Sequence, residues 1–323
     1  MGEIKRLPSV TIHVTVKNAE ETIKKCIGSL LKLDYPNKKI YVTEAYSTDK
    51  TYEILKQFGN KITLERVRGS APKAHNHAFK KIKSDLLAFT DADCVVDRNW
   101  LKNLVKVFNS PDVIAAGGFC KTPKNVNNLQ RLIGIELEDR FHRMPRYVNR
   151  LPTMNFCVRT NAVKKVKMNE SLTVTFEADW GSRLSKLGKI AYVPEAVVYH
   201  YHRSTLKNFF KQQLNYGKYV VKTPQVYIKS RQFGDYLSKP IMGLQLIVFN
   251  LFIISLIASA FSPPMTIISS SLIVVLLILY LLDILNFSKN IFDIFSYLGL
   301  FFIRTFAWTL GILSGISEIM RGK

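Results

Sequence analysis

Short apolar runs and amphipathic stretches alternate along the N-terminal two-thirds of the chain. The runs, such as residues 9–16 and 86–90, have the alternating or continuous apolar pattern of strands, whereas residues 21–33 repeat their apolar positions at helical spacing. This alternation predicts an α/β fold with a mostly parallel sheet, helices on its faces and ligands at the carboxyl ends of its strands. In the first connection, Asn18 and Glu21 have the spacing of a helix-capping box.

Long apolar runs replace this pattern from residue 240 onward. The chain has no Asp, Glu, Lys or Arg between Lys239 and Asp283. Residues 241–262 and 265–285 are each long enough to cross a hydrocarbon core of about 30 Å. The adjacent Pro263 and Pro264 interrupt the apolar run, and this interruption predicts a helical hairpin in the membrane.

A third apolar segment, residues 291–316, differs from the first two because Arg304 stands at its centre. Such a residue is costly in lipid unless it packs against partners. The segment therefore either spans the bilayer in that way or lies in the membrane interface, and the pattern leaves both open.

We expect an α/β domain over residues 1–225, a juxtamembrane linker over 226–240 and a membrane domain over 241–323.

The positive charge lies almost entirely before the apolar runs. The chain has 46 Lys and Arg against 24 Asp and Glu, which gives a net charge of +22. Only four of the basic residues and three of the acidic residues lie from residue 240 onward. A domain this basic attracts anions, which include nucleic acid, lipid headgroups and phosphorylated substrates. Basic residues are dense up to Lys239 and return at Lys289, so the positive-inside rule predicts that the α/β domain is cytoplasmic in a multi-pass protein of the cell membrane.

Two carboxylates follow a buried apolar run in the stretch LLAFTDADC. Asp91 and Asp93 come where the strand of residues 86–90 ends, and residues i and i+2 of an extended chain point the same way about 6 to 7 Å apart. Both can therefore address one ligand, and carboxylate oxygens suit Mg²⁺ or Mn²⁺, which can bridge the phosphates of a nucleotide. The alternative is that the pair caps the next helix or faces solvent.

The order of several motifs resembles that of the inverting family 2 glycosyltransferases of the GT-A fold. Along the chain these motifs are VTIHVTVKNAEE, DYPN with a strand that runs on to STD, DLLAFTDADC, NFCVRTNAVKKV, FEADWGSRLSKLG and VVYHYHRSTLKNFFKQQLNYGK. The similarity covers roughly residues 8–225 in the right order. It implies a GT-A domain, here followed by membrane helices, that uses a nucleotide-diphosphate sugar as donor.

The resemblance also implies nucleotide-binding positions. Val16 to Asn18 stand in the first nucleotide-binding turn, Glu44 takes the place of an Asp that contacts the nucleobase, and Asn76 lies near the place of the diphosphate. Helix capping is the alternative role for Asn18 and Asn76. Because Tyr46 replaces the usual Gly, the base contacts are altered and the identity of the nucleotide is left open.

The metal and the reacting groups follow from the same resemblance. Asp93 is expected to hold the divalent cation, and Asp91 to position the cation or the ribose. His200 is expected to contact the diphosphate or to complete the metal shell, with a structural role as the alternative. His200 and His202 share one face if strand alternation continues through them.

The expected general base comes from the FEADWGSRL stretch. Glu177 fills the family's catalytic position, while Asp179 has a plainer role available because a helix would let it pair with Arg183 four residues on. Glu177 has no charged residue three or four positions later, so it is the candidate base. The alternative exchanges the roles of the two carboxylates.

These assignments imply a single displacement at the anomeric carbon of the donor sugar. A membrane-tethered enzyme fits a lipid-linked or glycan acceptor at the cytosolic face, with polyprenyl phosphate as a specific alternative, and membrane lipids as further partners. A metal-dependent phosphohydrolase or nucleotidyltransferase would also use paired carboxylates, but would leave Glu177 without a role. A basic anchor for nucleic acid would leave the carboxylates unexplained, so we expect no nucleic-acid partner.

Overall fold

The computed structural model comprises two compact units. It describes residues 7–224, 228 and 237–322. The first unit is made of Met1–Val126 and Phe141–His202, and the second of Asn127–Arg140 and Arg203–Lys323. These units divide the chain at other positions than the domains expected from the sequence, and the expected linker at 226–240 lies mostly outside the described residues.

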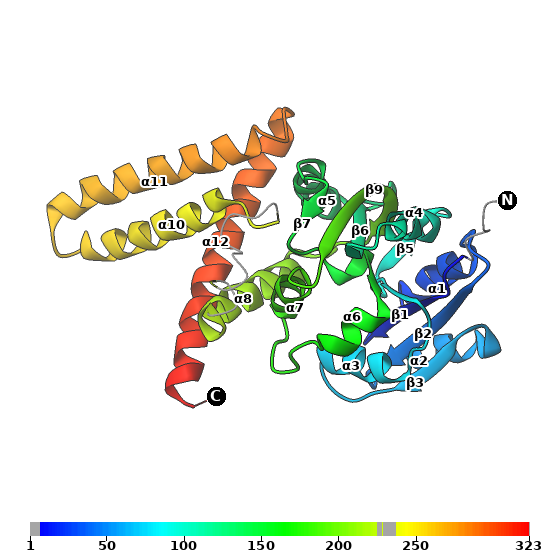
Figure 1. The fold of residues 1–323 in the computed structure, drawn as a ribbon. Helices are drawn as coiled ribbons and strands as arrows, with labels where there is room; N and C mark the ends of the chain where they lie inside the picture. The colour runs from blue at the N-terminus through cyan, green and yellow to red at the C-terminus, as the bar shows by residue number, and fades with distance from the viewer. Residues whose placement is uncertain (1–6, 225–227, 229–236, 323) are drawn as a thin grey trace. The chain divides into compact units, whose positions relative to one another are not determined.

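The first unit is built on a mixed, mostly parallel sheet (Figure 1). Its described strands are β1 (Val10–Val16), β2 (Lys38–Glu44), β3 (Thr63–Arg66), β4 (Leu86–Phe89), β5 (Cys94–Val96), β6 (Val113–Lys121), β7 (Tyr147–Val148), β8 (Phe156–Arg159) and β9 (Lys189–His200). They lie in the order β3-β2-β1-β4-β8-β6-β9-β5, with β7 beside β9. Strands β1 to β4 are parallel, as the alternation of strands and helices predicted.

Seven helices with described bounds belong wholly or partly to this unit. They are α1 (Ile23–Leu31), α2 (Thr51–Lys56), α3 (Ala71–Lys81), α4 (Trp100–Lys106), α6 (Thr160–Lys165) and α7 (Phe176–Leu184), with the end of α5 (Asn128–His142). Single 3₁₀ turns lie at Gly59–Lys61, Val107–Asn109 and Thr153–Asn155. Helix α1 buries one face, formed by Ile23, Cys26, Ile27 and Leu30. This i, i+3, i+4, i+7 spacing is the amphipathic pattern that predicted the helix.

The start of α1 differs from the sequence prediction. Asn18 does not cap the helix with Glu21, because α1 begins at Ile23 and Thr22 precedes it. Asn18 instead takes a left-handed backbone conformation, with φ of 52°. Its side-chain oxygen accepts a hydrogen bond from the backbone N–H of Thr48, 2.9 Å away, so it links the loop after β1 to the loop after β2.

Strand β4 is buried along its whole length, as its continuous apolar sequence predicted. It pairs with β1 on one side and β8 on the other. Its last residue, Phe89, lies in a cluster of aromatic rings with Phe79, Phe156 and Trp180, whose ring centroids are 5.7 to 6.3 Å from that of Phe89. The aromatic cluster fixes the end of β4, from which the Asp91–Asp93 stretch leaves the core.

The second unit consists of helices. Its described helices are α5 up to Arg140, α8 (Leu206–Lys222), α10 (Pro240–Ala258), α11 (Pro263–Ile284) and α12 (Ile291–Met320). Helices α10, α11 and α12 are each long and apolar enough to cross a membrane. Pro263 and Pro264 open α11, so the hairpin expected from the proline pair is present. Apolar side chains on its outer surface, such as Ile257 and Ile267, are exposed.

Arg304 has the partners that its place in an apolar segment requires. Its side chain is buried in α12 and donates to Glu136 of α5, at 2.7 Å, and to Gln245 of α10, at 3.0 Å. Arg140, one helical turn after Glu136, pairs with the same carboxylate. Protein contacts therefore neutralise the arginine that distinguished this segment in the sequence.

Helices α8 and α12 approach each other so closely that glycine is required at the contact. A Cβ added to Gly311 would lie 2.1 Å from the carbonyl oxygen of Leu214, and one added to Gly217 would lie 2.2 Å from that of Trp308. The contact continues to the end of α12, where Lys218 and Lys222 both pair with Glu318. The two helices thus form one packed pair within the second unit.

Candidate active site

The carboxylates of the LLAFTDADC stretch lie where two strands of the first unit meet. Strand β5 begins directly after Asp93 and pairs antiparallel with β9, so that Cys94 stands opposite His200. The backbone N–H of Tyr201 donates to the carbonyl oxygen of Asp93 at 3.0 Å. The end of β9 is therefore held against the residues that follow β4.

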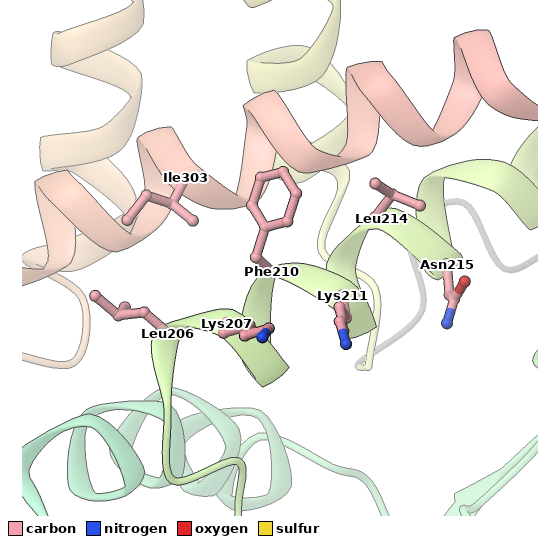
Figure 2. A pocket seen from close by; sticks show the side chains of 7 residues that line it. All are labelled: Leu206, Lys207, Phe210, Lys211, Leu214, Asn215 and Ile303. Carbon is pink, nitrogen blue, oxygen red and sulfur yellow. The ribbon is translucent and has the colours of Figure 1, made fainter.

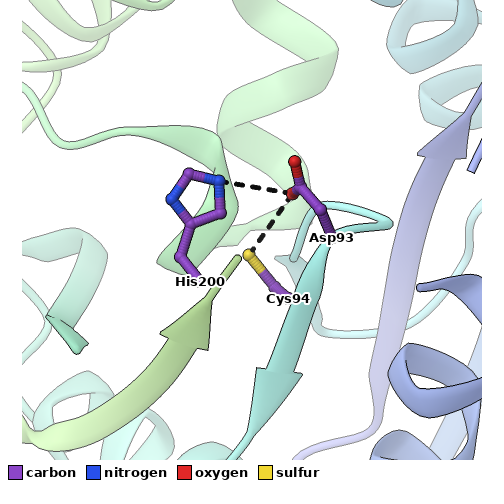
Figure 3. Close-up of side chains that lie close together, drawn as sticks. All are labelled: Asp93, Cys94 and His200. Carbon is purple, nitrogen blue, oxygen red and sulfur yellow. Dashed lines mark hydrogen bonds and ion pairs between the residues drawn. The ribbon is translucent and has the colours of Figure 1, made fainter. Parts of the chain in front are cut away.

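Three potential metal ligands converge at this point (Figure 3). The ligand atoms of Asp93, Cys94 and His200 all lie within 4.8 Å of one another. Nε2 of His200 is 3.4 Å from Oδ1 of Asp93. Burial alone would lower the pKa of His200, but the negative charge of Asp93 and a hydrogen bond to it outweigh burial and raise the pKa well above its usual value.

Cys94 is the member of this cluster that sequence reasoning missed. Burial, followed by the charges of Asp93 and Asp91, raises the pKa of its thiol well above the usual value. A neutral thiol is a poor ligand for a hard cation. The carboxylate of Asp93 and the imidazole of His200 are thus the groups of the cluster that fit Mg²⁺ or Mn²⁺.

The expected part of Asp91 in positioning the cation or the ribose stays a prediction. Its carboxylate is not part of the three-residue cluster, although Asp93 is only two positions away. Its backbone carbonyl accepts hydrogen bonds from the N–H of Cys94 at 3.1 Å and from the thiol of Cys26 at 3.4 Å, which closes the turn between β4 and β5. Neither Asp caps α4, because that helix begins at Trp100 after Asn99.

His200 and His202 share one face, as strand alternation predicted. Their ring centroids are 4.6 Å apart with an edge-on arrangement. Nε2 of His202 lies 3.4 Å from the hydroxyl of Thr122. His202 therefore supports one side of the His200 ring.

The two candidate bases have different surroundings on α7. Asp179 pairs with Arg183 one turn later, at 2.9 Å from its Nε, which confirms the pairing that the sequence predicted. Glu177 in the first turn instead accepts two hydrogen bonds at Oε1 from Thr153, at 2.6 Å from the backbone N–H and 2.5 Å from the hydroxyl. Glu177 is half-buried, and the structure leaves the choice of base as a prediction.

Buried contacts fix both sides of the Glu177–Thr153 pair. Trp180, one turn after Glu177, lies 5.7 Å from the ring of Phe89 at the end of β4. On the other side, Asn155 accepts from the indole of Trp100 at 2.8 Å and donates to the carbonyls of Phe119 and Ala196 at 3.0 and 2.8 Å. The amide of Asn155 is buried, and these three bonds hold the 3₁₀ turn that carries Thr153.

Two loops beside this region carry the expected nucleotide-binding positions. Val16 is the buried last residue of β1, and its carbonyl oxygen accepts from the N–H of Ala45 at 2.9 Å. Besides its bond to Thr48, Asn18 donates its backbone N–H to the hydroxyl oxygen of Ser47 at 2.9 Å. The loops after β1 and β2 are therefore joined by side-chain contacts at the carboxyl ends of both strands.

Glu44 is wholly buried at the end of β2. One carboxylate oxygen accepts from the backbone N–H of Ser47, and the other accepts from Nε of Arg66 at 2.7 Å. Burial alone would raise the pKa of Glu44, but the hydrogen bonds from Ser47 and Arg66 outweigh it and hold the pKa below its usual value. Both oxygens are used within the protein, so the contact to a nucleobase that was expected of Glu44 remains a prediction.

A stack of cationic and aromatic side chains covers Glu44, and sequence reasoning did not find it. The guanidinium of Arg66 lies 4.1 Å from the ring centroid of Tyr46, and that of Arg68 lies 4.5 Å from it. Tyr46 has a left-handed backbone with φ of 54° and is 38% exposed. The sequence did carry a signal for this stack, because Tyr46 replaces the usual Gly and Arg66 and Arg68 follow about twenty residues later.

Asn76 and its neighbour His75 lie inside the first unit. The amide of Asn76 donates to the carbonyl of Met168 at 2.8 Å and to Glu170, and accepts from the N–H of Met168. Asn76 is not a helix cap, because it lies within α3. Its expected place near the diphosphate stays a prediction. His75 packs against His13 with their Nδ1 atoms 3.1 Å apart, and burial lowers its pKa to about 3.

Comparison with known proteins defines the class. The family model described as glycosyl transferase family 2 matches residues 11–173, just over half of the 323-residue chain. Among curated proteins, the glycosyltransferase AglE of Haloferax volcanii is 30% identical over 35% of this chain and 39% of its own length. A dolichyl N-acetyl-α-D-glucosaminyl phosphate 3-β-D-2,3-diacetamido-2,3-dideoxy-β-D-glucuronosyltransferase of Methanococcus voltae is 23% identical over 64% of this chain and 71% of its own length.

Solved structures share the fold. The mannosyltransferase PcManGT from Pyrobaculum calidifontis, solved with GDP-Man and Mn²⁺, has a TM-score of 0.59 and 13% identity over 97% of this chain and 88% of its own. S. aureus TarS 1–349, solved with UDP-GlcNAc, has a TM-score of 0.51 and 14% identity over 98% of this chain and 92% of its own. The chain belongs to glycosyl transferase family 2. Its first unit has the GT-A fold, and three apolar helices that could span a membrane follow it.

Proposed function

We propose that the protein is a membrane-bound inverting glycosyltransferase that moves a sugar from a nucleotide-diphosphate sugar to a lipid-linked or other membrane-proximal acceptor at the cytosolic face. The observation that carries the proposal is the meeting of Asp93 and His200 at the end of a buried strand. Glu177 supports it as well, because Trp180 anchors its helix to the last residue of that strand. Ligands of open α/β sheets bind at this edge.

The nucleotide is expected at the two joined loops after β1 and β2. Tyr46 is exposed, carries Arg66 and Arg68 on its ring, and offers a flat cationic surface on which a base can stack. The carboxylate of Glu44 holds Arg66 in that position. This arrangement favours stacking over hydrogen-bond readout of the base, so uridine and guanosine diphosphate sugars are both candidate donors.

Asp93 and His200 are the residues that would hold a divalent cation, with the backbone turn of Asp91 between the strands shaping the site. The donor set fits, because a carboxylate oxygen and an imidazole nitrogen lie within reach of one ion, and Mn²⁺ accepts both ligand types. A cation bound there would neutralise charge on the leaving diphosphate. His200 must lose its proton to act as a ligand, so metal binding releases a proton.

Glu177 is proposed as the general base. Its carboxylate takes the proton of the acceptor hydroxyl while the hydroxyl oxygen forms its bond to the anomeric carbon of the sugar. The bond from that carbon to the diphosphate oxygen breaks in the same displacement, and the electron pair leaves with the nucleoside diphosphate. Thr153 binds one oxygen of Glu177 with two hydrogen bonds and so leaves Oε2 to receive the proton.

The acceptor is proposed from the membrane helices. The hairpin of α10 and α11 carries exposed apolar side chains along its length, which suits insertion into lipid. The Methanococcus voltae relative is named for transfer to a dolichyl-linked sugar phosphate. A lipid-linked acceptor would reach the GT-A unit from the cytosolic leaflet, in agreement with the positive residues before Lys239.

A donor panel tests the proposed function. Detergent-solubilised full-length protein is incubated with Mn²⁺, membrane lipid extract and UDP- or GDP-sugars in turn, and both nucleoside diphosphate and lipid-bound sugar are measured. We expect one donor to give equal amounts of the two products, and neither product without the lipid extract. Release of inorganic phosphate or nucleoside monophosphate with no sugar transferred would instead assign a phosphohydrolase or nucleotidyltransferase and overturn the proposal.

A further inference from the structure

One side of α8 borders an open groove within the second unit (Figure 2). Leu206, Phe210 and Leu214 of α8 and Ile303 of α12 give it an apolar wall. The three α8 residues are spaced four apart and therefore lie on one face of the helix. The groove has a volume of about 690 Å³, which is in the range of small-molecule sites, about 300 to 1,000 Å³.

Two lysines form the polar edge of this groove. Lys207 and Lys211 lie one turn apart, each directly after an apolar wall residue. The other lysines of α8, Lys218 and Lys222, both pair with Glu318. Among the described residues no carboxylate forms an ion pair with Lys207 or Lys211, so the groove combines an apolar wall with positive charge that the described protein does not neutralise.

If the α10–α11 hairpin inserts into a bilayer, contacts within the second unit place the groove near the lipid headgroups. Helix α12 meets the α10–α11 hairpin at the open end of the hairpin, where Tyr280 hydrogen-bonds Thr305 and Gln245 accepts from Arg304. The turn of the hairpin points away from α12, and Phe261 beside that turn is 88% exposed (Figure 1). The hairpin therefore enters the bilayer from a base that α12 and α8 form.

The charge of α8 argues against a position of this helix in the hydrocarbon core. Helix α12 packs along α8, and Gly311 lies against the backbone of Leu214. Lys207 and Lys211 would be costly in lipid tails but suit the headgroup layer, where their charged ends reach water and phosphate. The groove then lies where headgroups and acyl chains meet.

We propose that this groove binds an anionic phospholipid of the membrane. The lipid phosphate lies between Lys207 and Lys211, and an acyl chain lies along Leu206, Phe210 and Leu214 against Ile303. Charge complementarity selects an anionic over a zwitterionic headgroup, because the two lysines add attraction only for a net negative lipid. At about 1 kcal/mol for each lysine, the preference is expected to be about 30-fold. The inference does not depend on the donor or the acceptor of the proposed reaction.

The test is lipid retention by the full chain. The purified protein is assembled into nanodiscs of phosphatidylcholine with 10% phosphatidylglycerol, released into mild detergent, and the lipids that stay bound are counted by native mass spectrometry. We expect phosphatidylglycerol to be enriched on the wild type and the enrichment to fall by about 10- to 30-fold in Lys207→Gln/Lys211→Gln. Lys207→Arg/Lys211→Arg should keep the enrichment, which shows that the site survives substitution.

A matched control removes the same charge elsewhere. Lys24 and Lys32 are exposed lysines of the first unit, and Lys24→Gln/Lys32→Gln should retain phosphatidylglycerol as the wild type does. Equal retention by the Lys207→Gln/Lys211→Gln protein, or no preference for phosphatidylglycerol in the wild type, would contradict the proposal. Displacement of phosphatidylglycerol by equimolar polyprenyl phosphate would also overturn it and assign the groove to an acceptor lipid.

Discussion

Thr153 binds Glu177 twice, because its backbone N–H and its hydroxyl both donate to the same carboxylate oxygen, at 2.6 and 2.5 Å. Asp179, two residues further along α7, is bound by Arg183 of its own helix. The first contact joins two segments of the fold, whereas the second is local. This difference in surroundings gives the two carboxylates separable roles.

Replacing Glu177 by Gln should lower turnover while leaving donor binding nearly unchanged. The amide keeps the shape and can still accept from Thr153, but it cannot take a proton, so kcat is expected to fall about 10²- to 10⁴-fold. Initial rates and donor affinity measured on the same preparation check this. The control is Asp179→Asn, which should cost at most a few tenths of a kcal/mol in stability.

Two results would change the assignment of the base. An Asp179→Asn protein without activity beside an active Glu177→Gln protein would exchange the two roles. A full-rate Glu177→Gln protein would remove the need for a base and indicate an acceptor that is already ionised, as a polyprenyl phosphate is.

Thr153 should act through Glu177 and not on the substrate. Thr153→Val removes the hydroxyl donor and keeps the backbone N–H and the shape, so we expect kcat to fall about 10-fold with KM for the donor unchanged. Thr153→Ser should restore the rate. In a Glu177→Gln background the valine should cost nothing further, and a full 10-fold loss there would show that Thr153 acts independently of Glu177.

Binding of a nucleoside diphosphate should depend on a divalent cation and on Asp93. Asp93→Asn removes a ligand charge at a half-buried position, so the increase in thermal stability that GDP or UDP gives with Mn²⁺ should disappear. Asp112→Asn, at an exposed carboxylate that pairs with Lys189, is the control and should keep the increase. Equal nucleotide affinity in excess EDTA would remove the metal from the proposal.

Arg304 should be needed for the stability of the second unit. Arg304→Leu removes the donor to the side-chain oxygen of Gln245 and leaves Glu136 with Arg140 alone. Loss of one member of a buried ion pair costs about 3 to 5 kcal/mol. The melting temperature of the detergent-solubilised protein should therefore fall clearly. Arg321→Leu, an exposed residue after α12, should melt as the wild type does. Equal melting of both variants would argue against the buried network.

Topology can be read from introduced cysteines, because the four native ones are buried. Lys289 lies between α11 and α12, and Ala260 lies at the hairpin turn between α10 and α11. If the GT-A unit is cytosolic, an impermeant maleimide should label Ala260→Cys in intact cells and Lys289→Cys only after permeabilisation. Labelling of Lys289→Cys from outside would reverse the orientation.

Periodic patterns and ordered motifs were sufficient to predict the fold. The apolar stretch before Asp91 predicted β4, the proline pair predicted the hairpin turn, and the i, i+4 spacing of Asp179 and Arg183 predicted their ion pair. Each of these depends on neighbours in the sequence, for which period and propensity carry the information.

Contacts between distant segments were not predictable in this way. Thr153 meets Glu177 only because the core positions a 3₁₀ turn beside α7, and Cys94 meets His200 only through the pairing of β5 with β9. Asn18 failed as a predicted helix cap because its oxygen is engaged by the loop after β2. Local capping rules cannot include a partner that lies 30 residues away.

The contact between Arg131 of α5 and Asp293 of α12 joins residues 162 positions apart. A ribosome that adds about 5 to 20 residues per second makes α5 roughly 8 to 32 seconds before its partner helix exists. During that interval Arg131 lacks the carboxylate that binds it in the finished second unit. In a shortened chain that stops before α12, Arg131 never gains this carboxylate. Removal of the C-terminal helix to obtain a soluble enzyme should therefore expose α5 and favour aggregation.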